Sequence, residues 1–189
     1  MTVMIFKEKT IQLKNGKTAV LKTPEVEDAQ QLLDCIRTTS GETDFLSRSA
    51  EDWEETTVES EEKWIRNNRE SENDYVITCY VDGVAVGSCE ISFFSKGKSA
   101  HRAGLGISII KEYWNLGIGS AMFKELMQLA KEHEGTEIVE LEFVEGNDRA
   151  RALYEKFGFR IMATKPNAFK LKDGTYQNMC YMQNYIREE

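Results

Sequence analysis

The spacing of apolar residues along the chain separates helical segments from extended ones. In residues 117–133 the apolar positions recur every three or four residues, as on the buried stripe of an amphipathic helix. The same period predicts a helix over residues 147–157 and another around residues 61–69. A further helix is expected to begin with Thr23 as its N-cap and Pro24 at its first position, because both residue types favour a helix start.

Alternating apolar and polar positions, bounded by turn dipeptides, predict the strands. Hairpins are expected where residues that tolerate positive φ separate two extended runs, at Asn15-Gly16, Asp82-Gly83 and Asp173-Gly174. Further strands are predicted within residues 75–110, 138–144, 159–164 and 176–186. No repeat or flexible linker interrupts this order of helices and strands, so the pattern predicts a single α/β domain with a mixed sheet over residues 1–189.

Composition and charge exclude several classes of protein. The 189 residues are 41% hydrophobic and 30% charged, as in an ordinary globular domain, and the formal net charge of −8 argues against a nucleic-acid partner. No apolar run approaches the roughly 18 residues that span a bilayer, and the N-terminal apolar stretch is too short for a signal peptide. We therefore expect a cytoplasmic protein without membrane contact. The four cysteines form no C-x-x-C pair and only two histidines occur, which predicts buried free thiols and no metal site.

Residues 107–122 carry the most chemical information. They predict a strand that runs through a short loop into a helix whose first turn contains Gly117 and Gly119. The backbone N–H groups of such a turn point outward and the helix dipole adds partial positive charge, which together suit a pyrophosphate. A plain tight connection could use the same glycines. Two other phosphate motifs fail, because Met122 replaces the last small residue of the dinucleotide fingerprint and Ser92 replaces the first glycine of a Walker loop.

Two segments together resemble the GNAT superfamily of acyl-CoA-dependent N-acetyltransferases. Residues 114–119 resemble its pyrophosphate motif (R/Q)-x-x-G-x-(G/A), and residues 147–159 resemble its N-x-x-A-x-x-L-Y-x-x-x-G-F helix, in the family's order and spacing. The resemblance implies a single GNAT-like α/β (α+β) domain in which helices flank a central mixed, mostly antiparallel sheet, with the cofactor motifs within residues 104–159. Trp114 departs from the usual Arg or Gln, so phosphate binding is expected to rest on backbone donors.

The resemblance also implies acetyl-CoA as cosubstrate and a role for individual residues. The backbone of Ile107 and Ile109 would pair with the pantetheine arm, Asn147 would hold its amide or sulfur end, and Tyr154 would protonate the departing thiolate. Without the motif, Tyr154 would be interpreted as a core aromatic and Asn147 as an N-cap. The backbone donors expected at the pyrophosphate are those of Leu116, Gly117, Ile118, Gly119 and Ser120.

An amine acceptor arrives as an ammonium and must lose a proton before it attacks a thioester. Glu90 is the leading candidate for this general base, because strand alternation places it on a polar face beside the strand at residues 107–110. Related sequences often carry a glutamate where Gly104 stands here, so His101, Glu142 and a relay through water are alternatives.

The acidic residues between Glu51 and Glu62 number seven, with no basic residue among them. They are either a solvated helix face or, since the corresponding segment of the family borders the acceptor pocket, a rim that would favour a cationic acceptor.

We therefore predict an N-acetyltransferase that moves an acetyl group from acetyl-CoA to a primary amine of a small molecule or a protein N-terminus by direct attack. A non-catalytic acyl-CoA-binding module is the alternative, and a nucleotide-binding α/β protein ranks below both. Exposed aromatics such as Tyr181 and Tyr185 in the last strand would permit a homodimer.

Overall fold

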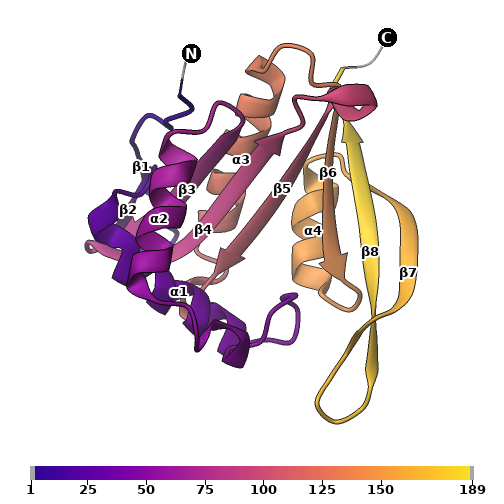
Figure 1. Ribbon diagram of the computed structural model, residues 1–189, viewed down its shortest axis with the longest axis horizontal. Helices are drawn as coiled ribbons and strands as arrows, with labels where there is room; N and C mark the ends of the chain where they lie inside the picture. The colour runs from indigo at the N-terminus through magenta and orange to yellow at the C-terminus, as the bar shows by residue number, and fades with distance from the viewer. Residues whose placement is uncertain (1–2, 188–189) are drawn as a thin grey trace.

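The computed structural model describes residues 3–187, which form an eight-stranded sheet with helices on both faces (Figure 1). The strand order is β1-β2-β3-β4-β5-β6-β8-β7, and every neighbouring pair is antiparallel except β5 with β6. The strands are β1 Lys9–Gln12, β2 Thr18–Lys22, β3 Asp74–Val81, β4 Val84–Phe93, β5 Arg102–Ile109, β6 Ile138–Val144, β7 Arg160–Lys170 and β8 Tyr176–Tyr185. The helices are α1 Ala29–Gly41, α2 Val58–Arg69, α3 Ile118–Glu132 and α4 Asp148–Lys156. The mixed, mostly antiparallel sheet expected from the resemblance is confirmed.

The helices lie in pairs on opposite faces of the sheet, α1 and α2 on one and α3 and α4 on the other (Figure 1). The larger core fills the α3–α4 face, where Ile91, Met122 and Phe123 are almost fully buried. A smaller core lies under α1 and α2 around Leu32 and Ile65. The four cysteines are buried and free, as predicted. No helix within residues 3–187 is long and apolar enough to cross a bilayer.

The three hairpin turns are confirmed, and their backbone angles explain the residues found there. Asp82 and Gly83 both have positive φ, 51° and 82°, between the paired strands β3 and β4. Gly16 and Gly174 have φ of 84° and 90° in the other two turns. L-residues with larger side chains rarely adopt this region, so the dipeptides determine where the chain reverses.

Two predicted boundaries are wrong because distant residues decide them. Helix α1 does not begin at Thr23; a 3₁₀ turn over Val26–Asp28 precedes it. The Thr23 hydroxyl instead accepts a hydrogen bond from the Phe6 backbone N–H at 2.9 Å. Strand β7 continues to Lys170 beyond the predicted end at residue 164, because it pairs with β8 on both sides of a register shift.

Strands β5 and β6 are paired for a short distance only. Residues Arg102, Ala103 and Gly104 face Ile138, Val139 and Glu140, and after these pairs the two strands separate. Beyond that point β5 is paired only with β4, and β6 only with β8. The sheet therefore opens into two arms, and one edge of each arm carries backbone groups that no strand satisfies.

Candidate active site

A cavity of about 870 Å³ lies between the separated parts of β5 and β6. Its wall includes both strands, the loop from β5 to α3, and one side of α4. Most of the site residues predicted from the sequence meet at this cavity, namely Glu90, Ile107, Ile109, Gly117, Gly119, Ser120, Asn147 and Tyr154. Residues from four separate segments of the chain thus line one space.

The turn before α3 is shaped by its glycines. Gly117 is the N-cap residue with φ of 97°, and a Cβ there would contact nothing, so the backbone angle and not space requires glycine. At Gly119 a Cβ would lie 3.4 Å from Ile109 Cδ1 and 3.5 Å from Leu153 Cδ2, in ordinary van der Waals contact with side chains of β5 and α4. The first helical bond runs from Ala121 N to Gly117 O, so the earlier N–H groups are free to bind an anion.

Trp114 stands where the family motif usually has Arg or Gln, and the structure places a cation against it. The guanidinium carbon of Arg149, from the first turn of α4, lies 3.2 Å from the centroid of the Trp114 ring. The indole N–H donates to the Ile109 carbonyl at 2.6 Å. Burial lowers the pKa of Arg149, and no carboxylate within residues 3–187 forms an ion pair with it. An unpaired guanidinium thus bridges the two arms beside the glycine turn.

Tyr154 of α4 is both a core aromatic and a cavity residue. Only 6% of it is exposed, and its ring centroid lies 5.4 Å from that of Phe123 and 5.8 Å from that of Phe143. Within residues 3–187 its hydroxyl makes no hydrogen bond. Burial raises the pKa of Tyr154 to about 12, with the charge of Arg149 opposing that shift. The phenol is therefore protonated at neutral pH and can donate a proton into the cavity.

Asn147 likewise combines the two interpretations open from the sequence. It is the N-cap of α4, where its side-chain oxygen accepts from the Ala150 backbone N–H at 3.2 Å, and it lines the cavity. The cap uses only the oxygen of the amide group. The Nδ2 donors remain for a ligand.

Glu90 of β4 lies opposite Gly106 of β5. A Cβ on Gly106 would be 3.7 Å from Glu90 Oε1, so the missing side chain leaves room for the carboxylate. Solvent reaches Glu90 through the cavity, but desolvation by the surrounding protein, and then the charge of Asp74, raise the pKa of Glu90 above its ordinary value. A raised pKa suits a group that must accept a proton near neutral pH. At Gly104 the ring of Phe94 takes the neighbouring space, 3.5 Å from where a Cβ would be.

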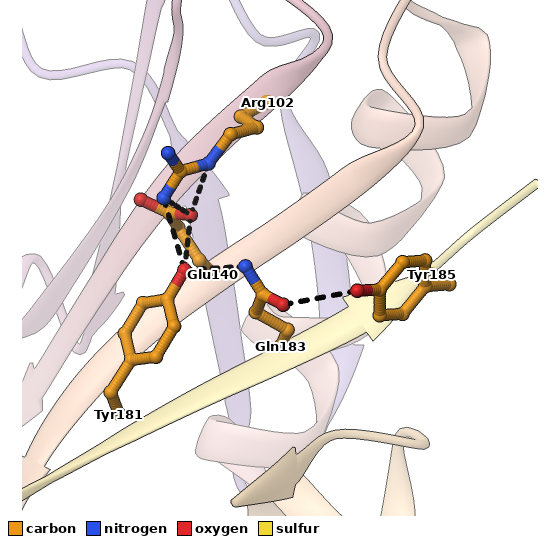
Figure 2. A network of polar contacts seen from close by, with 5 residues as sticks. All are labelled: Arg102, Glu140, Tyr181, Gln183 and Tyr185. Atoms are coloured by element: carbon orange, nitrogen blue, oxygen red, sulfur yellow. Dashed lines mark hydrogen bonds and ion pairs between the residues drawn. The ribbon is translucent and has the colours of Figure 1, made fainter. Parts of the chain in front are cut away.

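A polar network joins the arms where β5 and β6 begin to separate (Figure 2). Arg102 Nε donates to Glu140 Oε2 at 2.6 Å, and the Tyr181 hydroxyl donates to the same oxygen at 2.7 Å. Gln183 and Tyr185 extend the network along β8. Because it links β5, β6 and β8, this network holds the closed end of the gap.

The segment between α1 and α2 covers the cavity from the α1–α2 face. Thr43, Phe45 and Leu46 line the cavity, and a Cβ on Gly146 would lie 3.9 Å from the Phe45 ring. Lys172, in the turn between β7 and β8, forms an ion pair with Glu51 of this segment. The covering segment thus reaches both the β6–α4 turn and the last hairpin.

A model of the acetyltransferase (GNAT) family matches residues 38–159, which include the glycine turn, Tyr154 and the diverging strands. The chain belongs to the GNAT family. The family resemblance drawn from the two sequence motifs is confirmed.

Relatives and solved structures agree with this membership. The Escherichia coli protein named L-amino acid N-acetyltransferase AaaT is 28% identical over 107 residues, which are 57% of this chain and 65% of that protein. The chain thus spans less than two thirds of this curated relative. A GNAT acetyltransferase from Streptococcus pneumoniae has a TM-score of 0.81 at 26% identity, over 88% of this chain and 99% of that one. The structure of yncA from Salmonella typhimurium, solved with its cofactor acetyl-CoA, has a TM-score of 0.76 at 13% identity, over 90% and 95% of the two chains.

Some predicted site residues lie away from this GNAT cavity. Leu116 and Ile118 do not line it, and the Ile118 side chain is 1% exposed in the core, so only their backbone could serve a ligand. Of the alternative bases, Glu142 lines the cavity and His101 does not. Of the seven acids in residues 51–62, two border a neighbouring cavity of about 540 Å³ and the other five border neither cavity. None of the seven acids therefore lines the larger cavity, where the acidic rim was predicted.

Three features of the site were not predicted from the sequence. They are the stacking of Arg149 on Trp114, the network around Glu140, and the cover formed by residues 43–47. Each joins segments that are far apart along the chain. The one sequence signal for the first of them was a cation, Arg149, two residues after Asn147 in the second motif. Within residues 3–187 no group of three or more His, Cys, Asp or Glu side chains is placed to hold a metal ion.

Proposed function

We propose that this chain transfers an acetyl group from acetyl-CoA to a primary amine of a small molecule or a protein N-terminus. The observation that carries the proposal is one cavity lined by the N-terminus of α3, the unpaired edge of β5, Glu90 and Tyr154. Donor binding, proton removal and proton delivery each have a group there. Family membership and the relatives' names support the same reaction.

On the donor side, the pyrophosphate would bind the free N–H groups of Gly119 and Ser120, with Arg149 supplying the charge that Trp114 lacks. The pantetheine arm would lie along β5 in the gap, as an added strand does. Trp114 already uses the Ile109 carbonyl, so an amide that paired with Ile109 would need its N–H group.

The proposed chemistry is a direct transfer. Glu90 removes a proton from the ammonium, and the free amine nitrogen attacks the thioester carbonyl carbon. The carbon–sulfur bond then breaks, and the departing thiolate takes the Tyr154 proton, while the second proton lost by the attacking nitrogen restores the Tyr154 phenol. Backbone donors of β5 would polarise the carbonyl oxygen during the attack. An N-acetylated amine and free CoA are the products.

A thiol-release assay with acetyl-CoA over a panel of amines and peptides tests this function. We expect release only when an acceptor is present, together with a product heavier by one acetyl group. A thermal shift with acetyl-CoA gives a second measurement, because a ligand at 100 times its Kd stabilises by about 2.7 kcal/mol. Stabilisation by NAD or ATP but not by acetyl-CoA would contradict the proposal.

A non-catalytic acyl-CoA-binding module is the second candidate, and the bare backbone at Gly104 is the observation in its favour. Such a module would bind acetyl-CoA tightly and release no thiol with any acceptor. We also keep a cytoplasmic location and a homodimer as predictions. For the dimer, Tyr185 is 55% exposed, whereas Tyr181 is engaged in the network with Glu140.

A further inference from the structure

The positively and the negatively charged residues that line the cavity lie in different parts of it. The cations Lys14, Arg149 and Lys156 gather around the glycine turn: Lys14 N donates to Leu116 O at 3.1 Å, and Lys156 Nζ donates to Ser120 Oγ at 3.4 Å. This is the end proposed to hold the phosphates of acetyl-CoA. The lining carboxylates, Glu90, Glu140 and Glu142, lie elsewhere in the cavity.

Strand register places these carboxylates on the α1–α2 face. Glu90 is opposite Gly106, and Glu140 is opposite Gly104 on the other arm. Glu142 lies two residues beyond Glu140, so it shares that face and stands level with Gly106. Glu90 and Glu142 therefore flank the gap from its two sides at the same level along the strands.

Neither Glu90 nor Glu142 has an ion-pair partner within residues 3–187. Glu140 is different, because it is paired with Arg102 (Figure 2). That pairing also occupies Arg102, which does not line the cavity. Among the described residues, the acceptor side thus presents two unpaired carboxylates and no cation that could receive a carboxylate.

Two further observations indicate that a ligand fills this space. Tyr154 is 94% buried and lines the cavity, and its hydroxyl has no hydrogen-bond partner in residues 3–187. The cavity lining also includes the apolar side chains of Phe45, Phe169 and Met179, and strand register places Met179 on the same sheet face as Glu142. An occupant would need an amine for the carboxylates and an apolar body for these side chains.

We propose that the acceptor is a small amine that carries positive charge and no carboxylate, and that Glu142 binds its ammonium group from the arm opposite Glu90. The inference rests on the proposed function and restricts its acceptor. A free amino acid would place its own carboxylate against two unpaired carboxylates, which raises its KM. This chain would then differ in acceptor from the relative named for L-amino acids.

Pairs of acceptors that differ only in a carboxylate test the inference. Cadaverine is compared with lysine, and phenethylamine with phenylalanine, by kcat/KM in the thiol-release assay. We expect the amine to exceed its amino acid at least tenfold in both pairs. An amino acid that equals or exceeds its amine would overturn the inference, as would a peptide N-terminus preferred over every small amine.

Glu142→Gln tests the residue, with Glu137→Gln as control, since Glu137 precedes the same strand, is exposed and lines neither cavity. Glu142→Gln should raise KM for amines about tenfold and leave kcat nearly unchanged. It should also reduce the salt dependence of KM and lower the ratio of kcat/KM for each amine to that for its amino acid. Glu137→Gln should match the unmodified chain. If the kcat/KM ratio of amine to amino acid were unchanged in Glu142→Gln, Glu142 would have no role in binding the acceptor.

Failure of the proposed function gives a distinct result. If acetyl-CoA produces no thermal shift and no thiol release, the donor assignment is wrong. If acetyl-CoA binds without turnover, calorimetry of the same acceptor pairs in the presence of CoA decides the inference. Tighter binding of the amines would support the inference. Tighter binding of the amino acids, or no detectable binding of either class, would overturn it.

Discussion

Replacing Tyr154 with phenylalanine separates the structural and chemical contributions of this residue. The phenol oxygen makes no hydrogen bond within residues 3–187, while the ring packs against Phe123, Phe143 and Phe159. Tyr154→Phe keeps these ring contacts and removes the hydroxyl proposed to protonate the thiolate. Stability and turnover should therefore respond differently to the substitution.

The expected magnitudes follow from these contacts. Because no internal hydrogen bond is lost, the free energy of unfolding should change by no more than about 0.5 kcal/mol. A positioned general acid contributes roughly 10² to 10⁴ in rate, so turnover should fall by that factor, or about 3–5 kcal/mol in the activation barrier. Acetyl-CoA affinity should stay near its original value.

Tyr181→Phe is the matched control, because Tyr181 lines the same cavity but its hydroxyl donates to Glu140. Losing a hydrogen bond to a charged group should cost about 1.5–3 kcal/mol of stability. Denaturant unfolding, calorimetric binding of acetyl-CoA and steady-state thiol release provide the three measurements. If Tyr154→Phe turned over as fast as the unmodified chain, the assignment of Tyr154 as the acid would be refuted. If Tyr154→Phe lost as much stability as Tyr181→Phe, the argument that its hydroxyl makes no internal hydrogen bond would be refuted.

Three other predictions use the same measurements. A base must be deprotonated, so activity should fall as pH drops through the raised pKa of Glu90. Because the pKa of Glu90 is higher in the folded state than in the unfolded state, its ionisation destabilises the fold. Glu90→Gln should therefore be more stable than the unmodified chain at neutral pH, and the difference should vanish below about pH 4. Gly117→Ala and Gly135→Ala, both at positive φ in open space, should each lose about 1–2 kcal/mol of stability, but only Gly117→Ala should weaken acetyl-CoA binding. Arg149→Ala should weaken acetyl-CoA binding about tenfold with a smaller salt dependence, whereas Arg151→Ala, exposed and paired with Glu155, should not; equal effects would contradict the bridging role.

Local signals explain which elements were predictable. Helix α3 has a strong apolar stripe after a glycine turn, and each hairpin has a turn dipeptide whose backbone preference acts within a few residues. Thr23 shows the opposite case. Its hydroxyl could cap a helix, but the Phe6 N–H, 17 residues away, holds it. Where a side chain has two possible partners, only the folded chain selects between them.

The candidate site divides in the same way. The glycine turn and the helix with Asn147 and Tyr154 were predictable, because each motif is contiguous and its residues act through backbone geometry or one helix face. The sequence named Glu90 as a candidate base but could not choose between it and the alternatives, since that choice depends on what stands across the gap. Bare Gly106 opposite Glu90, and Phe94 beside Gly104, are facts of strand register.

By itself the sequence determined the family, the order of elements and the positions of the glycine turn and of Tyr154, because these follow from short-range periodicity and contiguous motifs. Only the tertiary structure decided that β5 and β6 separate after three residue pairs. That separation creates the cavity, lets Arg149 stack on Trp114 and places Glu142 across from Glu90. The physical reason is that charge and shape at a site depend on distances between segments remote in sequence, and no local pattern records those distances.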